Sequence, residues 1–146
     1  MLPSLELVEV SRAECLQLLA DERMGRVVFT EGALPAAWPV AYVLDGEEVV
    51  FRTARTGRLA TATSGRVVAF EVDRVDPDTH TGWSVLGVGA AYEIVDPRRL
   101  QELTRRGLAP WSRRSDLAVG IPLHLLSGRR ISMLDAVGAN GAAVPH

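Results

Sequence analysis

The sequence predicts a mostly β domain, an antiparallel barrel with helices at its periphery. Asp45-Gly46 separates two apolar stretches, as in a β-hairpin. Residues 66–75 alternate apolar and polar side chains with the period of a half-buried strand. No regular strand–helix–strand repeat runs along the chain, which argues against a doubly wound parallel sheet. The chain has 146 residues, which is about the size of one domain.

The first half of the chain contains one helix, three strands and a second, short helix. Ser11 and Glu14 form a capping box, which predicts a helix from Ala13 or just before it to near Gly25. Apolar stretches predict strands at 25–30, at 38–45 with Pro39 at its start or on an edge, and at 48–53. Asp45-Gly46 predicts a type I′ turn at 45–48, and residues 56–63 are expected to be helical.

The second half returns to strands. Strands are expected at 66–75 and 83–95, where the glycines of the second strand indicate a bend. Asp96 and Pro97 predict a helix that runs to about Arg106. The last strands are expected at 117–125 and 128–134, so a single domain covers residues 1–134. Residues 135–146 are small and polar, which predicts a mobile tail.

Composition excludes several classes of protein. The net charge is −2. The chain therefore lacks the excess of basic residues that is typical of proteins that bind nucleic acid or a membrane surface. The apolar runs are too short to span a bilayer, and acidic residues near the N-terminus argue against an export signal. The single cysteine, Cys15, fits a reducing compartment, so we expect a cytoplasmic protein. All 16 Lys and Arg residues are arginine, so anions must be bound by guanidinium, hydroxyl or backbone N–H groups.

Three arginines follow one another at intervals of three where a predicted strand ends. Arg52, Arg55 and Arg58 alternate with Thr53, Thr56 and Gly57. Guanidinium, hydroxyl and backbone N–H donors at a strand–helix junction are typical of a phosphate site. The alternative is a solvated edge whose arginines pair with acidic residues such as Glu71 or Asp73.

No stretch of the sequence predicts a catalytic nucleophile or a metal site. The serine of "GWSVLGVG" (82–89) lacks the spacing and the following helix of a nucleophile elbow. "GVGAAY" lies inside a predicted strand and lacks the third glycine of a dinucleotide motif. Asp76, Asp78 and His80 have the composition of an ordinary turn. We therefore expect neither catalytic side chains nor metal ligands.

The order of these motifs resembles the pyridoxamine 5′-phosphate oxidase-like family of flavin-binding split β-barrels, and in particular its small bacterial and actinobacterial members. The resemblance covers roughly residues 11–132. It rests on "WPVAYVLDGEEVVFRTARTGRLA" (38–60), "VVAFEVDRVDPDTHTGWSVLGVGAAYEIVD" (67–96), "APWSRRSD" (109–116) and "IPLHLLSGRRI" (121–131). It implies a six-stranded antiparallel split barrel that forms a homodimer, with FMN in a groove between the subunits.

The resemblance also implies which residues contact the cofactor. Arg52, Thr53 and Arg58 would bind the flavin phosphate, although the family commonly has lysine at the last position. Val40 and Tyr42 would contact the flavin ring, and Trp83 and Ser84 would lie near it. Trp111 and Arg129 would complete the groove from the other subunit.

The implied activity is a flavin-dependent oxidoreductase that acts on a small planar substrate. A bound flavin supplies its own redox chemistry, which fits a chain without catalytic side chains. Oxidation of vitamin B6 is not favoured, because the chain lacks the C-terminal substrate-binding segment of the true oxidases. Two alternatives remain: a deazaflavin (coenzyme F420)-dependent reductase on the same fold, and a non-catalytic flavin- or haem-binding carrier or sensor.

Overall fold

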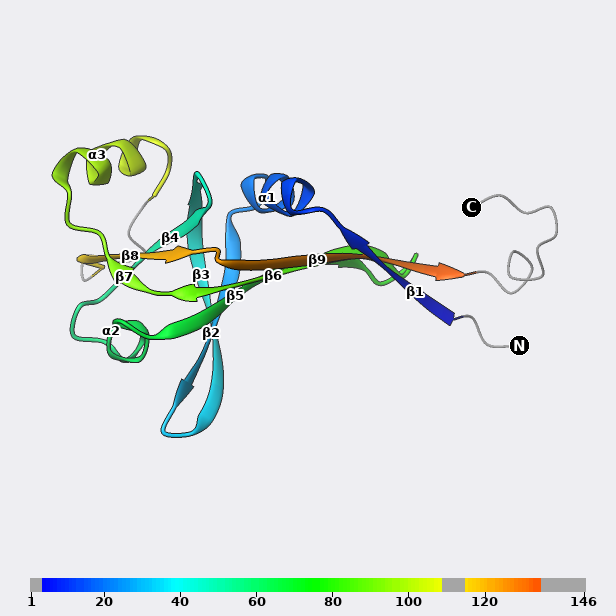
Figure 1. Ribbon diagram of the computed structural model, residues 1–146, viewed down its shortest axis with the longest axis horizontal. Coiled ribbons are helices and arrows are strands. Elements are labelled where there is room, and N and C mark those ends of the chain that lie inside the picture. The colour runs from blue at the N-terminus through cyan, green and yellow to red at the C-terminus, as the bar shows by residue number, and fades with distance from the viewer. Residues whose placement is uncertain (1–3, 109–114, 135–146) are drawn as a thin grey trace.

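The computed structural model describes residues 4–108 and 115–134, which form one antiparallel sheet and three helices (Figure 1). The strands lie in the order β1-β9-β6-β5-β2-β3-β4-β8-β7. They are β1 (Ser4–Val10), β2 (Met24–Glu31), β3 (Leu34–Asp45), β4 (Glu48–Thr53), β5 (Val67–Asp76), β6 (Thr81–Ala90), β7 (Tyr92–Glu93), β8 (Leu117–Pro122) and β9 (Leu125–Leu134).

Six of these strands, β6-β5-β2-β3-β4-β8, curl into a barrel, and β1, β7 and β9 extend beyond it. The barrel closes where β6 meets β8. A Cβ atom on Gly89 would lie 1.7 Å from the carbonyl oxygen of Pro122, so only glycine permits this approach. No ladder pairs β6 with β8 within the described residues, which leaves the barrel split at this seam. The predicted split antiparallel barrel is therefore confirmed.

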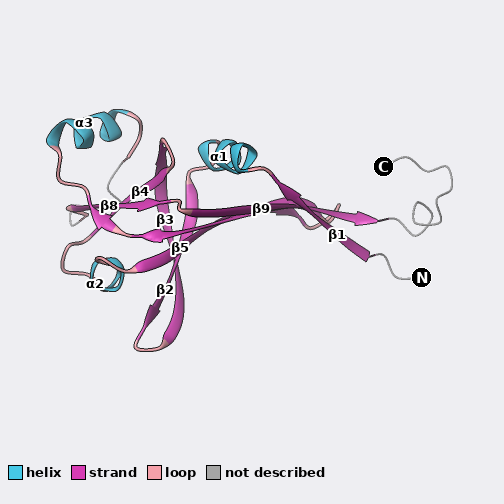
Figure 2. Cartoon of the chain, in the orientation of Figure 1, coloured by secondary structure: helices cyan, strands magenta, loops and turns pink. Residues whose placement is uncertain are grey.

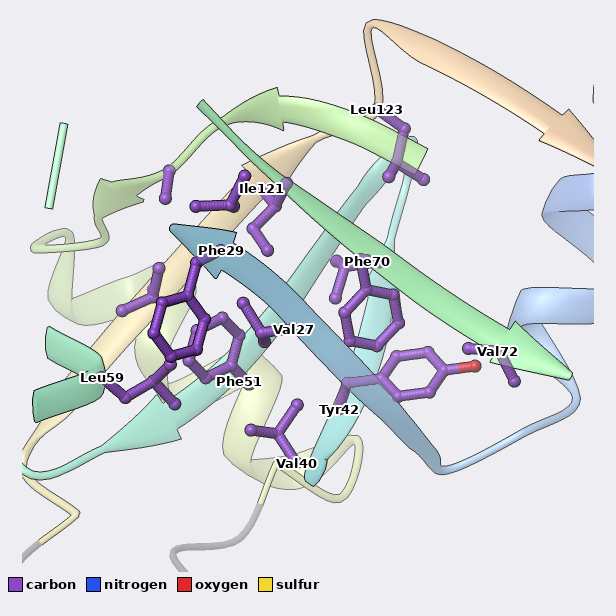
Figure 3. Packing of buried hydrophobic residues seen from close by; sticks show 14 of the residues in the cluster. Val27, Phe29, Val40, Tyr42, Phe51, Leu59, Phe70, Val72, Ile121 and Leu123 are labelled. Atoms are coloured by element: carbon purple, nitrogen blue, oxygen red, sulfur yellow. The ribbon is translucent and has the colours of Figure 1, made fainter. Parts of the chain in front are cut away.

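The barrel is filled by apolar side chains that alternate along its strands (Figure 3). Tyr42 from β3 and Phe70 from β5 meet edge to face, with ring centroids 4.8 Å apart. A second, smaller cluster lies outside the barrel, between the β4–β8 sheet and the third helix; it contains Val50, Ile94, Leu103, Leu108 and Ala118. β4 thus has two buried faces, one toward each cluster.

The three helices pack at the barrel's edges (Figure 2). They are α1 (Arg12–Ala20), α2 (Arg58–Thr63) and α3 (Pro97–Arg105). The Ser11 side chain accepts a hydrogen bond from the Glu14 backbone N–H at 3.1 Å, which confirms the predicted cap of α1. The Asp96 side chain caps α3 in the same way through the Arg98 backbone N–H. Among the described residues, none of the helices has the length and apolar character of a bilayer-spanning segment.

Several boundaries differ from the prediction. α1 ends at Ala20 instead of near Gly25, because the Arg23 carbonyl already accepts a sheet hydrogen bond from Tyr42 at 3.0 Å. β1 was not predicted; it pairs along its whole length with residues 128–134 of β9. The stretch 83–95 divides at Ala91, whose backbone bonds to Arg66 and Gly65, and the chain then moves from the edge of β5 to that of β8.

Two tight turns also differ from the prediction. The type I′ backbone occurs at Gly32-Ala33, where φ is positive at both residues (55° and 67°), and β3 therefore begins at Leu34 rather than Trp38. At the Asp45–Glu48 turn only Gly46 has positive φ (61°), so the predicted type I′ geometry is wrong there although the hairpin is present. The tail predicted at 135–146 lies outside the described residues.

Candidate functional site

The arginine-rich corner lies at the end of β4, where alternation sends neighbouring side chains to opposite faces. Phe51 is buried in the barrel, and Val50 belongs to the cluster beside α3. Arg52 therefore points to the α3 side of the sheet, and Thr53 points to the barrel side. The side chains of these two residues, which were expected to share a phosphate, are separated by the strand.

Arg52 is incompletely hydrogen-bonded. One terminal nitrogen, Nη2, donates to Thr104 Oγ1 at 3.0 Å, and the Nε atom is buried without a partner. Arg52 lines a surface pocket of about 440 Å³ together with four residues of α3, Leu100, Gln101, Thr104 and Arg105. No carboxylate pairs with Arg52 among the residues that the structure describes. The guanidinium thus carries an uncompensated charge at the edge of a pocket.

Arg58, at the start of α2, is paired. Its guanidinium contacts both carboxylate oxygens of Glu31 and lies 5.6 Å from the centre of the Trp38 ring. The hydrogen bond from Arg58 lowers the pKa of Glu31 below its ordinary value. The Arg58 side chain is 67% exposed, so solvent screens the pair. At this corner the Arg58 guanidinium thus lies beside the Trp38 ring and forms an exposed ion pair with Glu31.

Arg55 is also paired, through two hydrogen bonds to Glu93, and its backbone N–H donates to Asp116 at 2.8 Å. The sequence alternative named Glu71 and Asp73 as partners for these arginines. Both of those carboxylates instead face Arg26 of β2, at 3.1 and 3.7 Å. Two of the three corner arginines have acidic partners, but not the predicted ones.

Val40 and Tyr42 were expected to contact a cofactor ring, and the structure places both side chains inside the subunit. Both side chains are buried in the barrel, with exposed fractions of 5% and 4%. The Tyr42 hydroxyl donates to the Leu19 carbonyl at 2.5 Å, and burial raises the pKa of Tyr42 above its ordinary value. On β3, the side chain that shares the Arg52 face is Ala41, because Tyr42 lies directly opposite Phe51.

The other predicted residues lie on different surfaces. Ser84 on β6 is the direct cross-strand neighbour of Arg129 on β9, and both point to the outer face of the sheet. Trp83 points to the opposite face, packs against the barrel core and lines a pocket with Asp73 and Thr81. Trp111 lies outside the described residues.

One subunit therefore does not bring the predicted site residues together. The structure places Arg52 beside α3, Arg58 beside the β2–β3 hairpin, and Ser84 with Arg129 on the outer face of the sheet. Sequence reasoning missed Thr104 and Arg105, which lie next to Arg52 in the pocket. The alternation of buried residues in "EVVFRT" could have shown that Arg52 faces away from Thr53, but not which helix covers that face.

The comparisons with known proteins agree with this fold. The family model described as pyridoxamine 5′-phosphate oxidase matches residues 11–130. An uncharacterized protein of Mycobacterium tuberculosis is 40% identical over 132 residues, which cover 86% of each chain.

Two solved structures from Mycobacterium smegmatis are also similar. The FAD binding protein has a TM-score of 0.75 and 31% identity, and the match covers 86% of this chain and 98% of that one. The FAD and heme binding protein has a TM-score of 0.69 and 19% identity, over 92% of this chain and 79% of that one, and this likeness concerns the fold alone. Because the family model spans most of the sequence and the barrel is of the same kind, the chain belongs to the pyridoxamine 5′-phosphate oxidase family.

Proposed function

We propose that the chain binds a flavin nucleotide and acts as a flavin-dependent oxidoreductase on a small planar substrate. FMN was the cofactor expected from the sequence, and the 31%-identical relative is an FAD binding protein. Both cofactors have a phosphate attached to the ribityl chain of the flavin. The proposal therefore concerns the residues that would bind that phosphate.

The observation that carries the proposal is the unpartnered Nε atom of Arg52. A buried polar group without a hydrogen bond destabilises a fold by about 1–3 kcal/mol, and a charged group by more. Arg52 lines the adjoining pocket with an incompletely hydrogen-bonded guanidinium group, so an anion bound there would accept from that group, and Arg105 would add a second positive charge. The donor set therefore fits a phosphate.

Arg58 supports the same chemistry from the other side of the corner. Exposed ion pairs contribute little to stability, so Arg58 can exchange Glu31 for a more highly charged ligand at small cost. The neighbouring Trp38 presents a flat apolar surface. Thr53 points to the barrel side of β4, the side on which α2 packs, so its hydroxyl lies on the opposite face of the strand from Arg52.

We also propose that the site is completed in a homodimer. Ser84 and Arg129 lie on the outer face of the sheet, whereas Arg52 lies beside α3, so no single ligand could contact all of them within one subunit. A second copy would supply a second surface and form a groove between the two chains.

The bound flavin would supply the transfer of a hydride or of electrons between its ring and the substrate. The protein's part would be to hold the phosphate at Arg52, orient the ring and exclude water. None of these tasks needs a nucleophile or a general base, which agrees with the absence of a predicted catalytic group.

The absorbance spectrum of the purified protein, with mass spectrometry of the extracted ligand, tests the cofactor class. A flavin spectrum is expected, and a deazaflavin or haem spectrum would replace the proposal with the corresponding alternative. Titration of the flavin-free protein with FMN and with FAD then tests the site. Arg52→Ala should weaken binding roughly ten- to hundredfold, as the loss of a charged hydrogen bond implies.

The matched control is Arg98→Ala, an exposed arginine at the start of α3. It should leave flavin affinity at the wild-type value. Equal affinity of the Arg52→Ala variant and the wild type would show that the phosphate does not bind at this residue.

A further inference from the structure

The Thr104 hydroxyl of α3 is the only hydrogen-bond acceptor of the Arg52 guanidinium within the part of the chain that the structure describes. Its oxygen, Oγ1, accepts from Nη2 of Arg52 at 3.0 Å and donates to the Leu100 carbonyl, one helical turn earlier, at 2.8 Å. A hydroxyl has a single hydrogen, and the bond to Leu100 uses it. Oγ1 can therefore only accept from Arg52, which is the role that a guanidinium donor requires.

The sheet around Arg52 offers no second acceptor side chain. Ala118 of β8 lies directly opposite Arg52, and Ala41 of β3 occupies the same face on the other side of β4. Val50, two residues earlier on β4, also points to this face and belongs to the apolar cluster beside α3. None of these three side chains has a polar atom. The orientation of the guanidinium therefore depends on the helix and not on the sheet from which Arg52 extends.

The acceptor itself is held rigidly. The preceding residue, Leu103, is 1% exposed and anchors this turn of α3 in the cluster beside β4. A β-branched side chain has few χ1 rotamers in a helix, and the bond to the Leu100 carbonyl selects one of them for Thr104. Oγ1 is thus a fixed point to which the end of the longer arginine side chain is attached.

A hydroxyl can orient a guanidinium without cancelling its charge. Arg55 and Arg58 are paired with the carboxylates of Glu93 and Glu31, with which a phosphate would have to compete. Arg52 has no carboxylate partner in the described residues. An arginine that is ordered before its ligand arrives loses less conformational entropy on binding. Arg52 is therefore the corner arginine that is both ordered and fully charged.

We infer that Thr104 is the positioning residue of Arg52, and that it sets the preference of the site for a phosphorylated flavin over riboflavin. The inference rests on the proposed function and deepens it, because it names the residue of another element that prepares Arg52 for the phosphate. Without the Thr104 acceptor, the guanidinium would sample several orientations, and the phosphate would have to order it. Riboflavin has the same ring system but no phosphate, so its affinity should not depend on Thr104.

Titration of the flavin-free protein with FMN and with riboflavin measures this preference. Thr104→Val keeps the shape of the side chain and removes the acceptor at an exposed position of α3. It should weaken FMN binding about three- to tenfold, as the loss of one hydrogen bond implies, and leave riboflavin binding unchanged. Thr104→Ser retains the hydroxyl and should retain the wild-type ratio of the two affinities. A wild-type ratio in Thr104→Val, or an equal loss in Thr104→Ser, would overturn the inference.

Two further variants separate positioning from a general effect on the fold. Thr79→Val, in the β5–β6 turn, makes the same change at an exposed hydroxyl that contacts Thr81 instead of an arginine, and should leave both affinities unchanged. In the Arg52→Ala background, Thr104→Val should have no further effect on FMN binding, because its effect passes through Arg52. An undiminished effect in that background, or an equal loss of FMN and riboflavin binding in Thr104→Val alone, would overturn the positioning role.

Nuclear magnetic resonance of the flavin-free protein tests the positioning step without a ligand. The Arg52 guanidinium signals are assigned by their absence from Arg52→Ala. Rotation of this group about its Nε–Cζ bond should be slow in the wild type and in Thr104→Ser, and faster in Thr104→Val, which lacks the bond to Nη2. Equal rotation rates in the wild type and Thr104→Val would overturn the inference, whether or not the protein binds flavin.

The two kinds of measurement distinguish the possible failures. A protein that binds flavin, but in which Thr104→Val changes neither the rotation rate nor the preference for FMN, would contradict only this inference. A protein in which the rotation rate depends on Thr104, but which has no affinity for flavin, would contradict the proposed function and retain the positioning role.

Discussion

Arg99 belongs to α3 and Arg52 of β4 faces that helix, but their guanidinium groups differ in how many hydrogen-bond acceptors they have. Arg99 donates to Asp45 at 3.0 Å, to the Tyr92 hydroxyl at 2.6 Å and to Glu48 at 3.1 Å. All three of its nitrogen atoms have acceptors. Arg52 has one acceptor, the Thr104 hydroxyl, and a buried Nε atom with none.

The difference separates an arginine that holds the fold together from one that is available to a ligand. The Arg99 network ties α3 to the β3–β4 hairpin, and Arg106 reinforces it through Asp45 and the Leu44 carbonyl. A satisfied network of this kind fixes the position of the helix. That position in turn places Thr104 and Arg105 beside Arg52. Arg99 and Arg106 therefore hold α3 in the position where it forms one wall of the pocket. Arg52, whose hydrogen bonds are incomplete, contributes its charge to the same pocket.

The largest effect that tests this comparison is expected for Arg99→Met. The substitution leaves Glu48 and the Tyr92 hydroxyl without their shared cation, and it leaves Asp45 with Arg106 alone. We expect the free energy of unfolding to fall by about 2–3 kcal/mol, below the range for a fully buried pair because these groups are partly exposed. Urea denaturation measures it, with Arg98→Met on the same helix as the control. An unchanged midpoint would show that the network contributes nothing to stability.

A smaller effect of the opposite sign is expected for Arg52→Met in the flavin-free protein. The variant removes an unsatisfied buried N–H group and keeps the apolar stem, so stability should be unchanged or should increase by up to about 1 kcal/mol. The measurement is the same denaturation experiment. A loss of stability comparable to that of Arg99→Met would mean that Arg52 is also structural, and the comparison would fail.

The same distinction explains how much could be predicted from the sequence. Hairpin signals, the capping box at Ser11 and the alternation in β5 are local features, and they predicted the barrel and most of its elements. β1 has a comparable alternation of apolar and acidic residues in "SLELVEV", and this pattern could have predicted the strand. The break at Ala91 depends on a change of strand partner that no local pattern contains.

The arrangement of the candidate site residues is harder to predict from the sequence than the fold, because it depends on which face of a strand each side chain occupies rather than on residue type. Composition drew attention to Arg52 and Arg58, but the acidic partners of the corner arginines come from β2 and β7, far away in the sequence. Tyr42 and Val40 have the character of ring contacts, and the pairing of β3 with β4 places them in the core instead. Whether all guanidinium nitrogens of an arginine find hydrogen-bond acceptors depends on tertiary contacts, which sequence spacing does not define.

The smallest effect on stability is expected at Arg58, because its ion pair with Glu31 is exposed to solvent. Glu31→Gln removes the charge of the partner and keeps its shape, so the unfolding midpoint should not change measurably, because exposed ion pairs contribute little. If Arg58 helps to bind the flavin phosphate, the variant should bind flavin a few-fold more tightly, since the ligand no longer competes with a carboxylate.

The pH dependence of flavin binding sharpens this test. The pKa of Glu31 is lowered by Arg58, so in the wild type the competing carboxylate stays charged until the pH falls below its ordinary value. Releasing Arg58 by protonating Glu31 should therefore strengthen binding only at acidic pH, and Glu31→Gln should remove that increase. Equal affinity and equal pH profiles for the two proteins would assign Arg58 to the surface, leaving Arg52 as the arginine on which phosphate binding depends.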